Sequence, residues 1–495
     1  MSTQTPRYEF GPLDRRTLVA GLTPGQVLTI ALALLGTVLL VRLSPTGRGF
    51  AAAAVLLAAA AAAAFWQVAG RTPLEWLPVV ARWAARRARG RQRHRSAMPL
   101  LGLVGGEPAP APPDTLAGVR ILDHRIDATG ERVGIVHDRR AATYSLILTA
   151  RGRSFELADV EEKVRRLDGW GAVLAGLARA RSPIHRLQWV ERTGPDDGDE
   201  IGRYLASAAT VPAGHPSLAS YLDLADAAGP ASQPHELFLV VSISTGGARR
   251  AIRTAGGGDA GAAAVLVREV RHLARELRTA EVTVDGALSP RMVARALRTA
   301  FDPAARARLA RRAAGDPAEA GASEGNAWPL ATEATWAAYR SEGAWHATYW
   351  IAQWPRRPVG PDFFAHLLLG TTATRTVALT MEPVPTGRAH REVENALVQG
   401  LADDELRARA GFIGTARRRR EHDAVARREE ELAVGHAEFR MCGYVTVTAT
   451  DPEQLEIGCG EVEQAAERSR LELRRLYGQQ DSAFTCTLPL GRGLG

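Results

Sequence analysis

Two uncharged apolar runs near the N-terminus constrain this chain more than any other part of its sequence. They cover residues 22–41 and 49–70. An α-helix rises about 1.5 Å per residue, so about 20 apolar residues match the roughly 30 Å hydrocarbon core of a bilayer. The turn over residues 42–49 contains proline and glycine and is too short for anything but an antiparallel connection. The sequence therefore predicts a transmembrane helical hairpin with both chain ends on one side.

The distribution of arginines predicts which side that is. Only Arg42 and Arg48 lie in the turn, whereas the second run is followed by Arg71, Arg82, Arg86, Arg87, Arg89, Arg91, Arg93 and Arg95. Arginines close to a membrane span are retained in the cytoplasm. We expect a two-span protein of the plasma membrane with both termini cytoplasmic. Arg15 and Arg16 superficially resemble a twin-arginine export signal, but a second span follows at once, which favours an anchor.

A helix predicted over residues 73–88 carries the candidate membrane-interface residues. Its tryptophans and aliphatic residues share the helix with arginines, a pattern typical of a helix in the headgroup layer that binds anionic lipid. The candidate residues are Trp76, Arg82, Trp83, Arg86 and Arg87. A nucleic-acid-binding arm is the alternative interpretation. We favour the membrane, because juxtamembrane arginines usually determine topology.

Charge and cysteine content argue against several other classes of protein. The formal net charge is +8 at pH 7, and residues 82–95 alone contribute seven arginines. The excess is local, which disfavours a protein-wide surface for nucleic acid. Cys442, Cys459 and Cys486 show neither CxxC spacing nor histidines at zinc-ligand spacing. We therefore expect free thiols in a reducing cytosol.

The chain as a whole predicts a membrane-anchored α+β protein with layered α/β modules. We expect a membrane hairpin with its basic helix over 1–100, a Pro-rich linker over 101–117, an α/β domain over 118–302, a linker over 303–326 and a ferredoxin-like module over 327–495. The run over 105–113 cannot continue a helix and favours an extended spacer. A charged segment over 387–435 predicts two projecting helices, hinged near Gly411 and Gly414 and inserted into the last module.

Period-two and helical patterns assign the elements of both modules. The first module has predicted strands over 119–123, 133–137, 143–149, 184–190, 237–242 and 282–284, and helices over 157–180, 262–278 and 288–301. The last module has two predicted βαβ units, over 344–354, 361–369 and 374–381, and over 438–449, 452–477 and 483–488. Such tandem units predict a split sheet with antiparallel and parallel pairing.

The sequence shows no motif for nucleotide or metal chemistry. Lys163 is the only lysine and no glycine loop precedes it, so the phosphate-binding loop of ATP motors is missing. Gly256, Gly258 and Gly261 satisfy GxGxxG, but residues 249–255 are not apolar enough for the strand that a dinucleotide fold requires, which favours a flexible loop. The histidines lack the spacing of a metal site. We predict no catalytic residue, no metal and no cofactor.

Four aromatic residues are the candidates for docking a partner: Trp345, Tyr349, Trp350 and Trp354. Aromatic residues are typical of the centres of protein interfaces. The alternative interpretation is an aromatic strand packed between helices. Residues 417–420 are all arginine and suit DNA phosphates, but glutamates at 429–431 balance them, as in an exposed helix with ion pairs. Nucleic acid is therefore disfavoured as a partner.

Short stretches resemble subunits of secretion machines. Residues 21–26, Gly-Leu-Thr-Pro-Gly-Gln, resemble the entry to the first membrane helix of PrgI-family proteins, two-span subunits of conjugation machines. Residues 443–447, 471–473, 479–484 and 488–491 resemble the end of the N-terminal domain of type IV secretion ATPases, in which a motor domain follows. Residues 134–190 and 237–298 resemble EccE, a two-span component of the type VII translocon with a cytosolic α/β body.

These resemblances imply a membrane-anchored structural subunit of a secretion or conjugation translocon, and not an enzyme. The type IV-like interpretation implies that the module over 327–495 docks an ATPase on a separate chain at the cytoplasmic face. Other membrane subunits of the translocon and anionic lipid are the further partners. The first alternative is an EccE-like component of a type VII system, and the second is a membrane-bound enzyme with a transferase-like pocket in 118–302. Homo-oligomerisation and the transported substrate stay open.

Overall fold

The computed structural model describes residues 8, 10, 24–96, 110–152, 155, 157–179, 182–194, 210–212, 215–228, 234–409 and 416–494. The chain divides into two compact units, Gly11–Gln92 and a second unit that combines Met1–Phe10 with Arg93–Gly495. The first holds the apolar helices. The second, called the body below, holds the β-sheet. The predicted domain boundaries within the body stay predictions.

The described part of the first unit consists of three helices, α1 (Pro24–Leu43), α2 (Gly47–Phe65) and α3 (Pro73–Ala88). The described part of the first apolar run is helical, and the second run is helical up to Phe65, five residues short of its predicted end. Both helices are long and apolar enough to cross a bilayer. The turn is shorter than expected, because Thr46 already caps α2 by accepting a hydrogen bond from the Gly49 N–H. At the other end, the Gln26 side-chain amide donates to the Ala64 carbonyl at 2.9 Å. This bond fixes the alignment of the two helices.

The third helix has the bounds that the sequence predicts. It begins after Thr72, whose backbone N–H donates to Oε2 of Glu75 at 2.8 Å. Pro73 follows at the first helical position, where a helix makes no use of the missing N–H. Arg86 and Arg87 occupy the last turn, where positive charge interacts favourably with the helix dipole. Local sequence signals thus account for both ends of α3.

In the body, thirteen strands of the described residues form one sheet. They are β1 (Arg93–Arg95), β2 (Val119–Arg125), β3 (Arg132–Asp138), β4 (Thr143–Arg151), β5 (Ile184–Thr193), β6 (His235–Ser244), β7 (Thr283–Ala287), β8 (Ala331–Ala334), β9 (Tyr339–Ser341), β10 (Ala344–Gln353), β11 (Arg375–Pro383), β12 (Phe439–Ala449) and β13 (Glu472–Arg475). The order is β1-β8-β9-β10-β12-β11-β5-β6-β4-β3-β2, with β7 on β4 and β13 on β10.

Every strand pairing among the described residues is antiparallel. The parallel pairing expected for the last module is therefore wrong. The reason is that each helical crossover skips one position in the sheet. β10 and β11 are joined through a helix but have β12 between them, which runs antiparallel to both.

The sheet consists of two halves with the same connectivity. In the first half, α4 (Val160–Leu177) links β4 to β5 and α8 (Gly258–Thr279) links β6 to β7, and the order is β7-β4-β6-β5. In the second half, α11 (Ala365–Leu369) links β10 to β11 and α14 (Pro452–Arg468) links β12 to β13, and the order is β13-β10-β12-β11. The hairpins β2-β3 and β8-β9 precede the halves in the same way. One plan is therefore used twice.

Side-chain contacts identify equivalent residues in the two halves. Ser145 of β4 is hydrogen-bonded to Ser242 of β6 at 2.7 Å, between the two hydroxyl oxygens. Thr348 of β10 is hydrogen-bonded in the same way to Thr446 of β12 at 2.8 Å. Each pair joins the first and third strands of its half and lies on the same face of the sheet. The two hydroxyl pairs thus set the correspondence between the halves.

The correspondence places a local two-fold axis at the junction of β5 and β11. Ser242 of β6 pairs with Arg186 of β5, and Thr446 of β12 pairs with Thr376 of β11. Three residues further along each strand lie Trp189 and Leu379, which pair directly with one another. A two-fold axis perpendicular to the sheet would pair two equivalent residues with one another across the axis, as Trp189 and Leu379 are paired. The halves are therefore related as the subunits of a symmetric dimer are.

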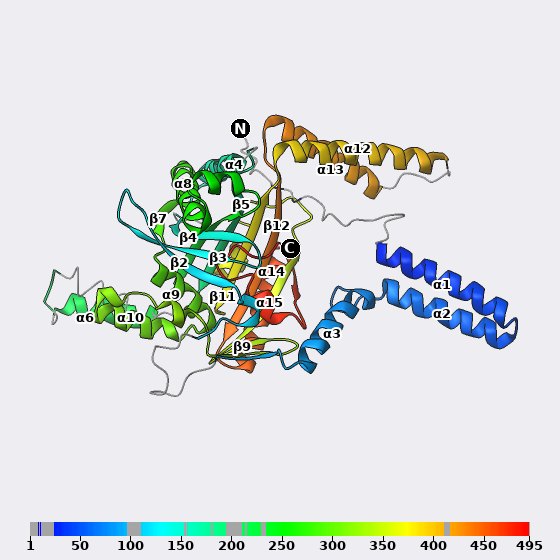
Figure 1. Ribbon diagram of the computed structural model, residues 1–495, viewed down its shortest axis with the longest axis horizontal. Helices are drawn as coiled ribbons and strands as arrows, with labels where there is room; N and C mark the ends of the chain where they lie inside the picture. The colour runs from blue at the N-terminus through cyan, green and yellow to red at the C-terminus, as the bar shows by residue number, and fades with distance from the viewer. Residues whose placement is uncertain are drawn as a thin grey trace. The chain divides into compact units, whose positions relative to one another are not determined.

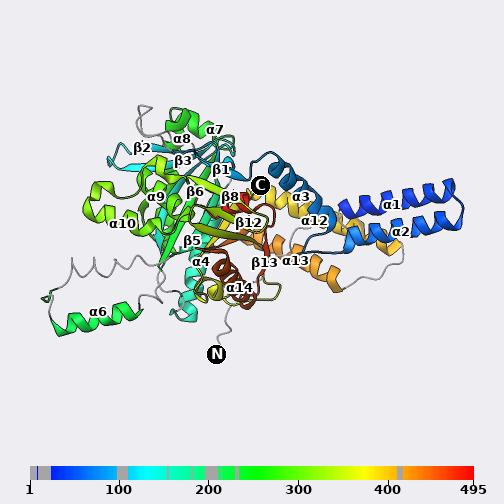
Figure 2. The same ribbon diagram turned by 90° about the horizontal axis from the view of Figure 1, so that it is seen from below.

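Helices cover both faces of the sheet. One face carries α4 and α8 over the first half and α11 and α14 over the second, and Trp189 packs against both of these cores. The other face carries α9 (Pro290–Phe301), α10 (Ala305–Gly315) and α15 (Gln480–Phe484) over a third core. Figure 1 shows α4 beside α8 and α9 beside α10. Figure 2 shows α14 beside β12 and β13.

The strand predicted over 483–488 is wrong, since these residues form the end of α15 and the turns after it. The edge of β10 opens between β9 and β13, and the Gln480 side chain fills this gap. Its amide oxygen accepts from the Thr348 N–H at 2.7 Å and its amide nitrogen donates to the Thr348 carbonyl at 3.2 Å. Phe484 and Leu488 can then both enter the third core. The fourth strand of this half is β13, which pairs with β10.

The segment predicted as a linker over 303–326 contains α10, which is tied to the sheet by a buried ion cluster. Arg192 of β5 and Arg306 of α10 both bind Glu236 of β6, with N–O distances of 2.5 and 2.8 Å. Burial alone would raise the pKa of Glu236, but the two guanidinium groups lower it to about 2. Glu236 therefore stays ionised and holds the helix in place.

The GxGxxG glycines lie at the turn between two helices and in the first residues of the second helix. The preceding residues form α7 (Arg249–Thr254), and α8 begins at Gly258, so no strand leads into the glycines as a dinucleotide site requires. The flexible loop expected there is a tight turn instead. Gly261 is buried in α8, and a Cβ atom on it would lie 2.6 Å from the Ile252 carbonyl oxygen. Close packing of α7 on α8 explains this glycine.

Replacing Gly261 by alanine should destabilise the body by about 1–3 kcal/mol, because the added methyl group forces the two helices apart. Gly460 of α14 is the matched control, since a Cβ there meets nothing within 4 Å. Gly460→Ala should be neutral or stabilising by up to about 1 kcal/mol. Denaturant unfolding of the full chain in detergent measures both. Equal effects of the two variants would contradict the packing explanation.

Candidate membrane and partner interfaces

The outward surface of α1 and α2 is the first candidate interface. Large apolar side chains face away from the helix pair, among them Leu35, Val55 and Trp66, which are 68, 69 and 68% exposed. Exposing apolar surface to water costs about 25 cal/mol per Å². A bilayer removes this cost. The two helices therefore have the length and the surface of membrane spans, which suggests a membrane protein.

Both predicted interface tryptophans of α3 lie against arginines. The Arg71 guanidinium is 5.4 Å from the Trp76 ring centroid, and the Trp76 indole N–H donates to the Val68 carbonyl at 2.9 Å. The Arg87 guanidinium is 5.3 Å from the Trp83 ring centroid. Amphipathic rings with adjacent positive charge suit the interfacial region of a bilayer. The structure thus brings each tryptophan together with an arginine.

The other predicted interface residues lie on the same helix. Arg82 folds back so that its Nε donates to the Pro78 carbonyl, at 3.0 Å, while Arg86 is half-buried. Leu77 and Val80 are 63 and 43% exposed and form an outward apolar strip. An apolar strip beside arginines fits a helix in the headgroup layer. Contact of these residues with anionic lipid stays a prediction.

The structure does not gather the four predicted docking residues into one surface. Tyr349 is only 1% exposed, and its hydroxyl donates to Oε1 of Glu463 on α14 at 2.8 Å. Trp345 shares its face of β10 but is half-buried, with the Arg340 guanidinium 5.4 Å from its ring centroid. Trp350 points to the opposite face of the strand. Tyr349 is thus a core residue, as the alternative interpretation describes.

Trp354 belongs to an aromatic cluster that sequence reasoning missed. Its ring stacks with Phe10 at a centroid distance of 5.2 Å and with Phe364 at 6.2 Å. Phe10 also meets Phe363 edge-on at 5.3 Å. These residues are far apart in the sequence, and no local pattern signals their contact. The cluster attaches the segment before α1 to the body.

A β-bridge strengthens this attachment. The Tyr8 N–H donates to the Val359 carbonyl at 2.9 Å, and the Val359 N–H donates to the Tyr8 carbonyl at 3.0 Å. On the other side of the apolar helices in the sequence, β1 pairs with β8, where Arg93 binds Glu333 at 2.8 Å. The chain segments that flank the helix pair therefore both join the body.

The predicted projecting helices are α12 (Thr386–Arg409) and α13 (Ala416–Val434), which lie side by side in Figure 1. A small core of Val384, Ala389, Val393 and Leu432 joins them at their base. Arg428 of α13 binds Glu438, just before β12, and anchors the arm to the sheet. The predicted hinge glycines and the side chains of the arginine run over 417–420 lie outside the described residues.

Polar residues at the centre of the sheet hold the backbone near the C-terminus. The Gln188 side-chain amide donates to the Cys486 carbonyl at 2.9 Å and accepts from the Gly491 N–H at 2.8 Å. The Thr380 hydroxyl donates to the Arg492 carbonyl at 2.6 Å. Gln188 and Thr380 pair directly across β5 and β11. This polar centre serves to fasten residues 486–492 over the sheet.

The three cysteines and the single lysine of the chain lie in the body. Burial raises the pKa of the Cys442 and Cys459 thiols and raises that of Cys486 to about 12, so all three stay protonated and are poor nucleophiles. Lys163 lies on α4, with Nζ 3.6 Å from Oδ2 of Asp362, and not on a phosphate-binding loop. Among the described residues, no three His, Cys, Asp or Glu side chains come together as metal ligands.

The fold and these surfaces define a class of protein with two candidate membrane helices and a large antiparallel α/β body. A family model described as "Putative type VII ESX secretion system translocon, EccE" matches residues 231–351. This segment is less than half of the chain. It runs from β6 to β10, so it contains the end of the first half of the sheet and the start of the second. No curated protein matches the chain. The similarity suggests a component of a secretion-system translocon.

The stability of the body should depend on pH through one buried histidine. His346 of β10 is enclosed, with the hydroxyl oxygens of Ser341 and Thr448 at 2.8 Å from Nε2 and 2.9 Å from Nδ1. Burial lowers its pKa to about 3. Below pH 6.5 the unfolded chain takes up a proton that the folded chain does not, so stability falls as the pH falls from 6.5 towards 3. The loss is about 2 kcal/mol between pH 6.5 and 5.

His346→Gln should remove this part of the pH dependence in denaturant unfolding of the full chain. Ser341→Ala is the control, because it removes a hydrogen-bond partner and keeps the titrating group. It should lower stability at every pH and keep the slope. A slope in His346→Gln equal to that of the unmodified protein would show that another group is responsible.

Proposed function

We propose that this protein is an EccE-like, membrane-anchored structural component of a type VII secretion translocon and that it has no catalytic role. The observation that carries the proposal is the family match over residues 231–351, together with two N-terminal apolar helices. The buried polar centre supports a structural role, because its groups are used to hold the chain itself. This choice corresponds to the first alternative drawn from the sequence.

The type IV-like interpretation has less support. It rests on the short stretches that resemble PrgI-family proteins and the N-terminal domain of type IV ATPases, and no comparison bears on these stretches. Residues 443–447 belong to β12, and residues 471–473 are the start of β13 and the residue before it. The order β13-β10-β12-β11 supports our proposal that residues 327–495 adopt a ferredoxin-like split βαβ plan. Such a plan occurs in many unrelated proteins, so it does not favour a type IV system.

The attachment of both flanking segments to the body supports a two-span hairpin. The segment before α1 joins the body through Tyr8 and Phe10, and the segment after α3 joins it through β1. If both apolar helices cross the membrane, the two segments emerge on one side, as this attachment requires. The arginines after α2 favour the cytoplasmic side. We propose that both termini and the body are cytoplasmic.

We further propose that the body docks the ATPase and other membrane subunits of the translocon. Trp345 with Arg340 is the strongest docking candidate, since an aromatic ring and an arginine are the side chains most often dominant at interface centres. Truncation cannot test this, because residues 118–302 and 327–495 share one sheet through β5 and β11. Removing either part would expose a strand edge and the apolar cores beneath it. Point variants of the full chain are required.

The topology predicts a specific pattern of protease accessibility in intact cells. A protease site inserted between Pro45 and Thr46 should be cut from outside, because the turn between two spans faces away from the cytoplasm. The same site inserted in residues 101–109 should be protected, as should tags at residues 1 and 495. Immunoblotting of intact and permeabilised cells measures this. Cleavage of either terminal tag from outside would overturn the proposed orientation.

Affinity purification of the full chain in mild detergent should recover subunits of a type VII translocon, including its ATPase. Trp345→Ala and Arg340→Ala should each reduce the recovered ATPase at least about tenfold, since a central interface residue contributes about 2 kcal/mol. Trp336→Ala, which alters a half-buried tryptophan outside β10, is the control and should not. Recovery of type IV subunits would favour the type IV-like interpretation instead. Recovery of no partner, with substrate turnover, would favour the enzyme alternative.

A further inference from the structure

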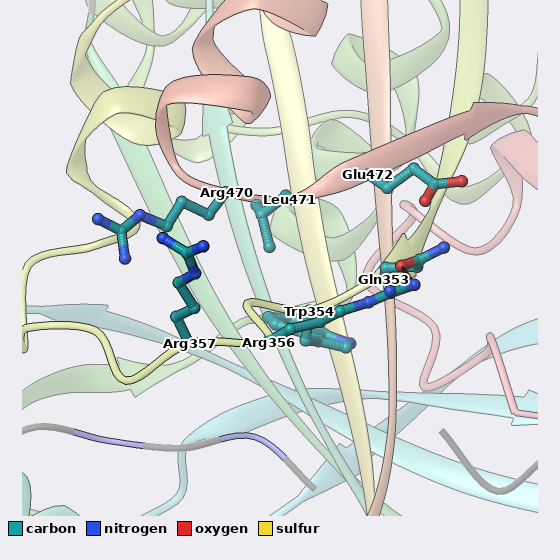
Figure 3. A pocket seen from close by; sticks show the side chains of 7 residues that line it. All are labelled: Gln353, Trp354, Arg356, Arg357, Arg470, Leu471 and Glu472. Carbon is teal, nitrogen blue, oxygen red and sulfur yellow. Dashed lines mark hydrogen bonds between the residues drawn. The ribbon is translucent and has the colours of Figure 1, made fainter. Parts of the chain in front are cut away.

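A basic pocket opens beside the aromatic cluster of Trp354. Its volume is about 410 Å³, and it lies where the turn between α14 and β13 meets the segment after β10. Three arginines, Arg356, Arg357 and Arg470, line it together with Trp354, Leu471 and Glu472 (Figure 3). Positive charge therefore prevails in the pocket.

The single glutamate of the pocket is already engaged by another arginine. Oε1 of Glu472 lies 2.7 Å from Nη2 of Arg474, on the same strand. Arg356 donates a hydrogen bond to the side-chain oxygen of Gln353 and points along the other wall. The guanidinium groups of Arg357 and Arg470 have no ion-pair or hydrogen-bond partner among the described residues. Figure 3 shows these two side chains directed to the same side of the pocket.

The first half of the sheet has a carboxylate at the equivalent position. Arg470 ends α14 in the left-handed conformation, with φ +58°, and Glu281 ends α8 in the same conformation, also with φ +58°. In the first half, Oε2 of Glu281 accepts from Nε of Arg166 at 3.1 Å. The carboxylate that pairs with an arginine there is replaced in the second half by a further arginine. The second half therefore lacks an internal anion at this position.

We propose that the pocket binds a phosphate-type anion, either free phosphate or the phosphate of a lipid headgroup. Guanidinium groups present planar N–H donors that match the oxygens of phosphate. Trp354 already stacks with Phe10 and Phe364, so recognition falls to the arginines and not to base stacking. The site is independent of the proposed function. An anion bound to Arg357 would also order the segment from Trp354 to Val359, which holds Tyr8 and Phe10.

Calorimetric titration of the full chain in detergent tests the pocket. The probes are sodium phosphate and short-chain dihexanoyl phosphatidylglycerol, each at constant ionic strength set with potassium chloride. We expect saturable binding, weakened about tenfold by Arg357→Gln and by Arg470→Gln, because each loses a charge-assisted hydrogen bond. Arg312→Gln, an exposed arginine of α10, is the matched control and should bind as the unmodified protein does. Thermal melts verify that the exposed substitutions leave the fold intact.

The two probes distinguish the sources of the anion. Binding of sodium phosphate that both variants weaken assigns the pocket to free phosphate, whereas variant-sensitive binding of the lipid alone assigns it to a headgroup. Two results overturn the proposal. One is the absence of saturable binding of either probe, and the other is an equal loss in Arg312→Gln, which would show a response to net charge only. Neither result bears on the translocon assignment, which depends on partners.

Discussion

The antiparallel pairing of β5 with β11 is the interaction on which the rest of the body depends. It joins two halves that would each end in an open strand edge, and it lets Trp189 contribute to both helix-covered cores. The seam is reinforced next to the pairing, where the Thr193 hydroxyl accepts from the Arg375 N–H at 2.9 Å. Arg375 itself is fully buried, and burial lowers its pKa while Glu191 opposes this shift. Glu191 of the first half therefore offsets part of the cost of burying the Arg375 charge in the second half.

Local signals in the sequence were sufficient for most helices and strands. The spans, α3 with its cap at Thr72 and α9 with its cap at Ser289 follow from short-range patterns, because capping and periodicity act over a few residues. The arrangement of the sheet could not be obtained in this way. Pairing of Trp189 with Leu379 joins residues far apart in the chain, and nothing in either strand's alternation specifies its neighbour.

The same difference applies to the candidate sites: residues that share one helix could be predicted from the sequence, and contacts between distant elements could not. The arginines and tryptophans of α3 could be named from the sequence, since they share one helix. The aromatic residues of β10 were named as a group, but their burial is decided by α14, which covers Tyr349 and leaves Trp345 partly accessible. Phe10 and the arginine pocket were missed. Their partners lie in other elements, and only the fold brings Arg470 close to Arg357.

The two attachments of the body to the segments around the apolar helices differ in their chemistry. β1 is joined to β8 by a ladder of backbone hydrogen bonds at the edge of the sheet. Tyr8 is joined to Val359 by two backbone hydrogen bonds, and Phe10 packs through ring contacts. The two attachments share no residue, so opening of the N-terminal one would leave β1 in the sheet. The body therefore keeps a second, independent connection to the apolar helices.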